Sequence, residues 1–279
     1  MPELPEVETI RRALEPAIAG RTVVTSWSHP SAKFTPATTL DGARLGDVDR
    51  RGKYLLVAVT GPGGARPREL VVHLGMTGLL RLVDTAGAPS DPYVRATLNL
   101  GEETLEYRDV RRFGRLRVVA AGDHAGIPTL AALGPEPLSE QFTPQSLYSA
   151  VASSRRALKT QLLSQRPVAG IGNIYADEAL WMAGVGPARR RITRAEATRL
   201  HDAIRTVIAA AIDRGGTTLR DYRTFDGGTG TNQDHLACYG RSGLPCPRCG
   251  TALRSRVLDA RTTTWCPTCQ STRRSPTVG

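Results

Sequence analysis

The chain has 279 residues, a formal net charge of +11 and a sequence pI of about 10.0. This length is typical of about two domains and allows a full hydrophobic core without disulfides. The sequence shows neither a run of about 18 apolar residues nor a basic-then-apolar leader, so it predicts no membrane span and no secretory signal. We therefore expect a cytoplasmic protein.

The first predicted element is a helix over residues 3–19, where apolar side chains recur at helical spacing. Removal of Met1 would leave Pro2 as a terminal secondary amine, with Glu3 and Glu6 close behind it in the chain. A free α-amino group titrates near pH ~8, so a useful fraction is nucleophilic at neutral pH and can form an iminium with a sugar or carbonyl carbon. An ordinary helix start, with Pro in the first turn and acids facing the helix dipole, explains the same residues.

From about residue 22 to residue 119 the sequence changes to short β-rich runs, separated by turns rich in Gly, Pro and Asp. This pattern favours a sandwich or a barrel-like sheet system. A stretch rich in Gly, Pro and Ala at 121–139 is typical of a linker. The strand candidates are 54–59, 70–74, 79–83, 96–100 and 116–120.

Beyond the linker, apolar spacing predicts helices at about 143–151, 155–165, 173–183 and 194–213. Thr193 and Glu196 form a capping box before the last of them. A Gly-rich turn joins the second and third helices, and Asn173 can cap the helix that follows this turn. The N-terminus of that helix suits a phosphate, although a plain interhelical turn explains the same residues. Residues 217–235 are predicted to form a loop.

Four cysteines near the end of the chain follow the pattern C-x2-C-x16-C-x2-C: Cys246, Cys249, Cys266 and Cys269. Two such pairs joined by a β-prone stretch are typical of a tetrahedral zinc site on a hairpin. Four thiolates leave no open coordination position, so we expect one structural zinc ion. Disulfides are the weaker alternative in a chain without a secretory leader. The remaining cysteine, Cys238, is expected to be a small buried hydrophobe.

The positive charge is concentrated in clusters of arginine. Residues 241–279 contain seven arginines against one acidic residue, and a second cluster lies at 189–191. The third cluster consists of Arg111, Arg112, Arg115 and Arg117. One such cluster is usually only a solvated surface, but three of the same sign favour a nucleic acid as the partner.

Together these features resemble the formamidopyrimidine-DNA glycosylase/endonuclease VIII family over essentially the whole chain. Leu4 favours the formamidopyrimidine-DNA glycosylase branch, because the endonuclease VIII branch typically has Gly at this position. The chain departs from the family pattern over 91–93, where Asp-Pro-Tyr replaces His-Asp-His, at Val110, which replaces Pro, and over 223–235. The matching motifs are PELPEVE at 2–8, GKYLL at 52–56, HLGMTG at 73–78, DVRRFG at 109–114, GIGNIYADEAL at 170–180, GGTTLRDY at 215–222, YGRSGLPC at 239–246 and the four cysteines.

The resemblance implies an α+β multidomain fold. Its parts are an N-terminal β-sandwich with a leading helix, a helix-two-turn-helix domain and a C-terminal four-cysteine zinc-ribbon hairpin. The implied boundaries are 1–120 for the catalytic β-sandwich domain, 121–139 for the linker, 140–235 for the helix-two-turn-helix domain with a lesion-recognition loop, 236–270 for the zinc finger and 271–279 for a basic tail.

The resemblance also implies a bifunctional DNA glycosylase and AP lyase of base excision repair, which removes 8-oxoguanine and formamidopyrimidines. Pro2 would attack the sugar C1′, displace the damaged base and form a Schiff base that permits β- and δ-elimination. Glu3 would act as general acid/base and Glu6 would support this site. Lys53 would contact phosphate and assist β-elimination, and Arg261 would grip phosphate for δ-elimination.

Attack at C1′ requires extrusion of the damaged nucleotide from the duplex. Met76, Arg111 and Phe113 match the intercalating trio of the family, which would fill the gap. Core packing is the alternative role for Met76 and Phe113, and the arginine-rich surroundings of Phe113 disfavour it. The other positions that match phosphate contacts of the family are Arg112, Arg155, Lys159 and Asn173. Tyr93, which stands where the family has a histidine, is also expected at the DNA interface. The loop over the flipped base matches Thr217, Thr218, Leu219, Arg220, Asp221 and Tyr222.

The implied partner is double-stranded DNA that contains oxidised bases. We expect a monomer without an organic cofactor or a membrane partner, located at the nucleoid of a bacterial cytoplasm. An endonuclease VIII-like glycosylase for oxidised pyrimidines and a non-catalytic protein that binds damaged DNA stay open as alternatives. Use of Pro2 as a tautomerase-type base is disfavoured, because such enzymes need neither a +11 charge nor a zinc ribbon.

Overall fold

The computed structural model describes residues 1–64, 66–86 and 91–270. The chain divides into two compact units. The first contains Met1–Ala131 and Arg214–Gln233, and the second contains Ala132–Asp213 and the segment that begins at Asp234. The expected basic tail, 271–279, lies outside the described residues. None of the helices in the described ranges combines the length and the apolar composition that a membrane span requires.

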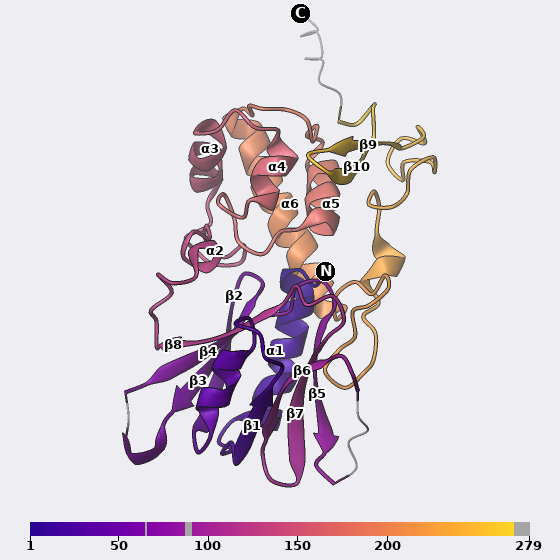
Figure 1. The fold of residues 1–279 in the computed structure, drawn as a ribbon. Coiled ribbons are helices and arrows are strands. Elements are labelled where there is room, and N and C mark those ends of the chain that lie inside the picture. The colour runs from indigo at the N-terminus through magenta and orange to yellow at the C-terminus, as the bar shows by residue number, and fades with distance from the viewer. Residues whose placement is uncertain (65, 87–90, 271–279) are drawn as a thin grey trace, which may run out of the picture. The chain divides into compact units, whose positions relative to one another are not determined.

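Among the described residues, the first unit consists mainly of two four-stranded antiparallel sheets and a leading helix (Figure 1). Their strand orders are β1-β6-β7-β5 and β2-β3-β4-β8. The expected β-sandwich with a leading helix is therefore confirmed. The elements are α1 (Leu4–Ile18), β1 (Thr25–Ser28), η1 (Thr35–Leu40), β2 (Arg44–Arg51), β3 (Tyr54–Thr60), η2 (Pro62–Gly64), β4 (Arg68–His73), β5 (Gly78–Asp84), β6 (Val94–Asn99), β7 (Glu103–Asp109), β8 (Arg115–Ala120) and α2 (Pro128–Ala131).

Helix α1 covers part of the sandwich core with one apolar face. Val7, Ile10, Leu14 and Ile18 recur every three or four residues, and each is 1% exposed. They belong to the same buried cluster as the inward-facing side chains of the two sheets. This burial of one stripe explains why the helix forms where the apolar spacing predicts it.

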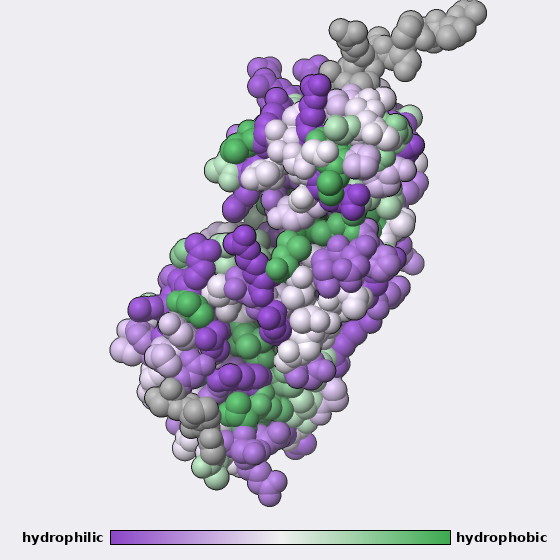
Figure 2. All heavy atoms as spheres, turned by 90° about the vertical axis from the view of Figure 1, so that its right-hand side faces the viewer, coloured by the Kyte–Doolittle hydropathy of each residue, from purple (hydrophilic) through white to green (hydrophobic). Residues whose placement is uncertain are grey.

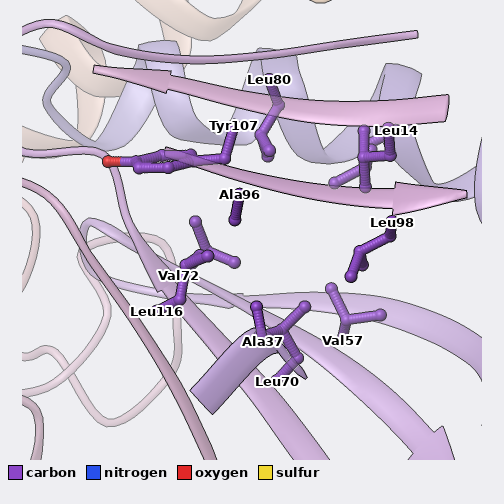
Figure 3. Close-up of a pocket in the computed structure, with 11 residues that line it drawn as sticks. Leu14, Ala37, Val57, Leu70, Val72, Leu80, Ala96, Leu98, Tyr107 and Leu116 are labelled. Atoms are coloured by element: carbon purple, nitrogen blue, oxygen red, sulfur yellow. The ribbon is translucent and has the colours of Figure 1, made fainter. Parts of the chain in front are cut away.

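The sandwich core contains a small cavity of about 20 Å³ (Figure 3). Leu14 of α1, Val57 of β3 and Leu98 of β6 are among the apolar side chains that line it. A space of this size holds at most one water molecule and offers it no polar partners, so we interpret it as a packing gap. The ring of Tyr107 lines the cavity, whereas its hydroxyl points away from the aliphatic side chains (Figure 3).

On the face of the molecule shown in Figure 2, hydrophilic residues dominate and the apolar patches are small and separate.

The five strand candidates correspond to β3, β4, β5, β6 and β8. The structure adds β1, β2 and β7, whose sequences are too polar to form an apolar run. In β7, for example, Glu106 and Asp109 are buried in the same strand as the apolar residues Leu105 and Tyr107. Hydrogen bonding to strands on both sides, β5 and β6, stabilises this polar segment as a strand.

The second unit contains the four predicted helices and a two-stranded hairpin. The capping box of the longest helix is confirmed, because Glu196 N–H donates to Thr193 Oγ1 at 3.2 Å and Thr193 N–H donates to Glu196 Oε2 at 2.7 Å. The predicted cap of α5 was wrong by one position: Gly172 is the N-cap, and Asn173 is the first helical residue. The elements are α3 (Pro144–Ala152), α4 (Leu158–Leu163), α5 (Asn173–Ala183), α6 (Arg194–Asp213), β9 (Arg254–Leu258) and β10 (Arg261–Trp265). The short helix η3 (Asn232–His235) begins in the first unit and ends in the second.

Two predicted boundaries differ from the structure. The segment 214–233, expected to belong with the helical domain, forms part of the first unit. The reason is a set of hydrogen bonds to the start of α1, which a reading of local sequence cannot show. The expected linker 121–139 includes the short helix α2, whose Leu130 is buried.

Candidate active site and nucleic-acid interface

The N-terminal residues lie at a buried helix start. Met1 is 51% exposed, whereas Pro2 is buried and Glu3 is 2% exposed. Glu3 is the N-cap of α1, and its N–H donates to Glu6 Oε2 at 2.7 Å. Pro5 occupies the first turn, where its missing N–H has no helical partner to lose. The segment is therefore an ordinary helix start in its backbone, yet it gathers two buried carboxylates behind Pro2.

Glu6 also connects this helix start to a distant loop. Its second carboxylate oxygen, Oε1, accepts a hydrogen bond of 2.7 Å from Thr217 N–H. The side chain is 1% exposed, so both bonds are shielded from water. Gly216 allows this approach: its φ is +82°, and a Cβ there would lie 2.8 Å from Glu6 Oε1. The structure thus brings the expected lesion loop to the residues behind Pro2.

The rest of that loop divides into a supported base and an exposed edge. Leu219, Arg220 and Asp221 are exposed. Tyr222 is buried, its hydroxyl donates to Gly215 O at 3.1 Å, and burial raises its pKa. Thr218 N–H donates to Gln233 Oε1 at 2.9 Å.

Two residues of the segment 223–235 support the loop, and the sequence pattern predicted neither of them. Asn232 Nδ2 donates to Thr217 Oγ1 at 2.9 Å, and Gly230 N–H donates to Thr218 Oγ1 at 3.0 Å. Asn232 is 5% exposed, so its amide lies in the interior of the unit. Polar residues in a Gly-rich segment carry no periodic signal, and only their contacts identify them as supports.

Lys53 lies in the short turn between β2 and β3 and is 4% exposed. Its neighbour Tyr54 pairs in register with His73 of β4, and His73 pairs with Arg115 of β8. Burial, together with the positive charges of Lys53 and Arg115, lowers the pKa of His73 to about 4. This end of the sheet therefore combines positive charge with a neutral imidazole, which suits a phosphate. His73 was missed as a site residue, although it begins the HLGMTG motif.

The three expected wedge residues lie together at the ends of the sheets. Arg111 Nη1 lies 3.4 Å from Met76 Sδ, and its guanidinium stands 4.8 Å from the centre of the Phe113 ring. Phe113 is 50% exposed, which contradicts core packing for this residue. Arg112, also exposed, has a φ of +54°, and its carbonyl accepts a 2.7 Å hydrogen bond from Lys33 Nζ.

The ring of Tyr93 packs beside an ion pair between Arg108 and Asp91. The guanidinium of Arg108 stands 5.0 Å from the centre of its ring, and Arg108 also pairs with Asp91 at 2.7 Å. A backbone hydrogen bond from Tyr93, together with Arg108 and Arg81, lowers the pKa of the Asp91 carboxyl. Tyr93 is 41% exposed, so the ring remains accessible on one side.

The expectation that Lys159 contacts phosphate is not compatible with its position. Its side chain is 1% exposed and lies 2.7 Å from Asp177 Oδ1, a fully buried carboxylate. Lys159 Nζ also donates to Thr262 O at 3.0 Å, and Thr264 N–H donates to Asp177 Oδ2 at 2.9 Å. The pair therefore joins helices α4 and α5 to strand β10. Because an ammonium held in this way is shielded from solvent, we assign Lys159 a packing role.

Arg155 and Asn173 remain available at the surface of the second unit. Arg155 is exposed, and Asn173 is half-buried at the first position of α5. Asn173 Oδ1 is buried and accepts no hydrogen bond within the described chain. The free N–H groups of the first turn of this helix are typical of a phosphate-binding position.

The four cysteines meet as the spacing predicts. All four Sγ atoms lie within 4.8 Å of one another, with 3.5 Å between Cys249 and Cys266 and 4.0 Å between Cys246 and Cys269. Zn–S bonds of about 2.3 Å in a tetrahedron place sulfur atoms about 3.8 Å apart, so the set fits one zinc ion. Trp181 Nε1 donates to Cys246 Sγ at 3.3 Å, as outer partners of metal ligands commonly do.

Two further residues are associated with strand β10: Cys238, which bonds it, and Arg261, which begins it. Cys238 is fully buried outside the ligand set, and its thiol donates to Thr264 O at 3.2 Å. Arg261 begins β10 and is exposed, directly after the turn formed by Asp259 and Ala260. Both turn residues have positive φ, +47° and +60°. Asp259 accepts a hydrogen bond from Thr160 of α4, which holds the turn.

Comparison with known proteins identifies relatives along the whole chain. Family models match at residues 1–116 (formamidopyrimidine-DNA glycosylase N-terminal domain), 133–223 (formamidopyrimidine-DNA glycosylase H2TH domain) and 243–272 (zinc finger found in FPG and IleRS). A formamidopyrimidine-DNA glycosylase of Thermus thermophilus is 49% identical over 274 residues, which cover 97% of this chain and 98% of the relative.

Solved structures give the same result. The crystal structure of MutM (Fpg) from Thermus thermophilus matches with a TM-score of 0.88 at 47% identity, over 98% of this chain and 100% of that one. A mutant Lactococcus lactis Fpg in complex with DNA containing Fapy-dG matches with a TM-score of 0.88 at 33% identity, over 97% of this chain and 100% of that one.

Proposed function

The chain belongs to the formamidopyrimidine-DNA glycosylase family, and on that premise we propose that it is a bifunctional glycosylase and AP lyase for oxidised purines in duplex DNA. The observation that carries the proposal is the start of α1. There Glu3 and Glu6, 2% and 1% exposed, stand directly behind Pro2, and Glu6 holds the loop that begins at Thr217.

The proposed chemistry starts from the secondary amine that removal of Met1 creates. The nitrogen lone pair of Pro2 attacks C1′ of the damaged nucleotide, the C1′–N bond forms, and the glycosidic bond breaks as the base departs with the bonding electrons. Glu3 acts as general acid/base: the proton lost by the Pro2 nitrogen is returned to the sugar O4′ as the C1′–O4′ bond breaks, so the ring opens and the C1′=N iminium forms. The resulting iminium withdraws electrons from C2′, which permits elimination of the 3′ phosphate and then of the 5′ phosphate.

Positive groups of both units support phosphate binding in this proposal. In the first unit, Lys53 and Arg115 flank the neutral His73 at one end of the sheet. In the second unit, Arg261 on the hairpin and Arg155 are exposed. We propose that Lys53 assists β-elimination and Arg261 assists δ-elimination. If several of these groups meet phosphates, binding should fall steeply with salt.

The proposed substrates are formamidopyrimidines and 8-oxoguanine. A relative at 33% identity forms a complex with DNA that contains Fapy-dG, which supports the first of these substrates. Thr217 at the start of the loop of residues 217–222 bonds Glu6 of the helix behind Pro2, which supports a role for this loop over a flipped base. The proposed zinc hairpin, with four cysteine ligands, has a structural role in this reaction.

Borohydride trapping tests the proposal directly. The protein is incubated with a duplex carrying 8-oxoguanine opposite C, borohydride is added, and the trapped peptide is identified by mass spectrometry. We expect a covalent adduct on Pro2, little adduct in Pro2→Gly, and none in protein that retains Met1. An undamaged duplex is the control for substrate, and a duplex with an oxidised pyrimidine tests the endonuclease VIII-like alternative. An adduct on a lysine, or no adduct at all, would refute the assignment of Pro2.

A further inference from the structure

The wedge residues Met76, Arg111 and Phe113 come from two different loops. The first loop, residues 74–77, joins β4 to β5, and the second, residues 110–114, joins β7 to β8. Phe113 is 50% exposed and Arg111 is exposed, so the core does not hold these side chains. Their relative positions must therefore depend on how the two loop backbones are held together.

One buried carboxylate links the two loops. Asp109, the last residue of β7, is 0% exposed. Its Oδ1 accepts a hydrogen bond of 2.6 Å from Thr77 Oγ1 in the first loop. Its Oδ2 accepts one of 2.7 Å from Gly114 N–H in the second loop. Thr77 Oγ1 in turn accepts a hydrogen bond of 3.0 Å from Arg111 N–H.

The two loop backbones also lie in direct contact. Gly75 has a φ of +65°, and a Cβ at this position would lie 2.5 Å from Gly114 N. A Cβ at Gly114 would lie 1.6 Å from the hydroxyl oxygen of Tyr107. That hydroxyl points away from the sandwich cavity and donates to His73 O at 3.3 Å (Figure 3). The two loop backbones are therefore packed closely against each other and against Tyr107 at Gly75 and Gly114.

We propose that Asp109, acting through Thr77 and Gly114, is a positioning residue that joins the two loops into one rigid wedge. The proposal rests on the proposed function, because it needs a nucleotide that is extruded from a duplex. Entry of the wedge into the base stack requires Met76, Arg111 and Phe113 to be in place together. Attack of Pro2 on an abasic sugar in single-stranded DNA requires no wedge. Loss of the Asp109 link should therefore impair the first process and spare the second.

Thr77→Val tests the link with little change of shape, because valine keeps the branched side chain of threonine and has a methyl group in place of the hydroxyl. Asp109→Asn changes the carboxylate instead and replaces one of its two acceptor oxygens with an amide nitrogen. Single-turnover excision of 8-oxoguanine from a duplex is measured beside borohydride trapping on a single strand with a preformed abasic site. We expect excision to fall about ten- to a hundred-fold in both variants, because small misplacements cost this much. The yield of trapping on the single strand should stay within about two-fold of the wild-type yield. This limit lies below the several-fold effect that the loss of one hydrogen bond has where that bond contributes.

Two further variants and one spectroscopic signal complete the test. Thr77→Ser restores the hydroxyl and should recover excision. Thr85→Val makes the same chemical change at a hydroxyl that bonds Gly101 O at 3.0 Å, at the far end of β5, and should not affect excision. Fluorescence of 2-aminopurine opposite the lesion should report reduced extrusion in Thr77→Val. If Asp109→Asn fails to fold, Thr77→Val carries the test alone.

The outcomes separate this proposal from the proposed function. Equal losses of excision and single-strand trapping, or unchanged excision in Thr77→Val, overturn the role of Asp109 while Pro2 chemistry stands. Failure of Thr77→Ser to recover excision also counts against it. Absence of trapping in the wild-type protein, on both substrates, overturns the proposed function itself.

Discussion

The buried ion pair between Lys159 and Asp177 permits a quantitative prediction about the second unit. The two side chains are 1% and 0% exposed, and their charged atoms lie 2.7 Å apart. Asp177→Asn leaves an ammonium in the interior without its counter-charge and weakens the acceptor of Thr264 N–H. Broken buried pairs typically cost about 3–5 kcal/mol, so we expect the free energy of unfolding to fall by about that amount.

The two single substitutions should respond to pH in opposite directions. Burial raises the pKa of Asp177 to about 6 even beside Lys159. In Lys159→Met we expect a still higher pKa, so the folded protein binds a proton that the unfolded chain does not hold, and the loss of stability grows as pH rises. In Asp177→Asn the buried amine has a lowered pKa, so the loss grows as pH falls. Lys159→Met is therefore less damaging at about pH 5.5 than at about pH 8, and Asp177→Asn shows the reverse.

Urea denaturation followed by far-UV circular dichroism, at both pH values, measures these losses. The double variant Lys159→Met, Asp177→Leu should recover much of the stability, because it removes both charges. About 1–3 kcal/mol of the loss should remain, because Thr262 O and Thr264 N–H lose their partners. Asp202→Asn is the control: Asp202 is 66% exposed beside His201, and we expect a change below about 1 kcal/mol. Losses of similar small size in both single variants, or the same pH trend in both, would refute this reasoning.

Three further predictions concern the first unit and the hairpin. Glu6→Gln leaves one acceptor for the N–H groups of Glu3 and Thr217, so hydrogen exchange at Thr217 should speed up about 10- to 100-fold, and unchanged exchange contradicts this role. NMR titration should give His73 a pKa of about 4, whereas its pKa in the unfolded chain is 6.5. The free energy of unfolding should therefore fall by up to about 2–3 kcal/mol as the pH drops from 6.5 to 4. His73→Gln should flatten that fall, and an equal fall in the variant would show that other groups cause it. Cys266→Ser should release zinc and weaken binding to duplex DNA, as measured by metal analysis and by titration with DNA, and full zinc occupancy would contradict the assigned ligand set.

Local patterns in the sequence determined the elements and the metal site. Apolar spacing predicted α1 and the four main helices because burial of one helical stripe has a period that the sequence itself carries. The Thr193–Glu196 capping box lies within four consecutive residues, so the sequence contains all of its atoms. The cysteine spacing similarly predicted the zinc site, because a hairpin brings the two pairs together wherever it packs.

The tertiary structure alone decided which polar side chains meet. Glu6 and Thr217 are 211 positions apart in the chain, and no periodicity records their hydrogen bond. Lys159 matches a phosphate-contacting position of the family, yet packing of β10 against α4 and α5 buried it beside Asp177. Side-chain type determines what a residue can bond, but burial and distance determine what it does bond. Those quantities depend on segments that the chain brings together only when it folds.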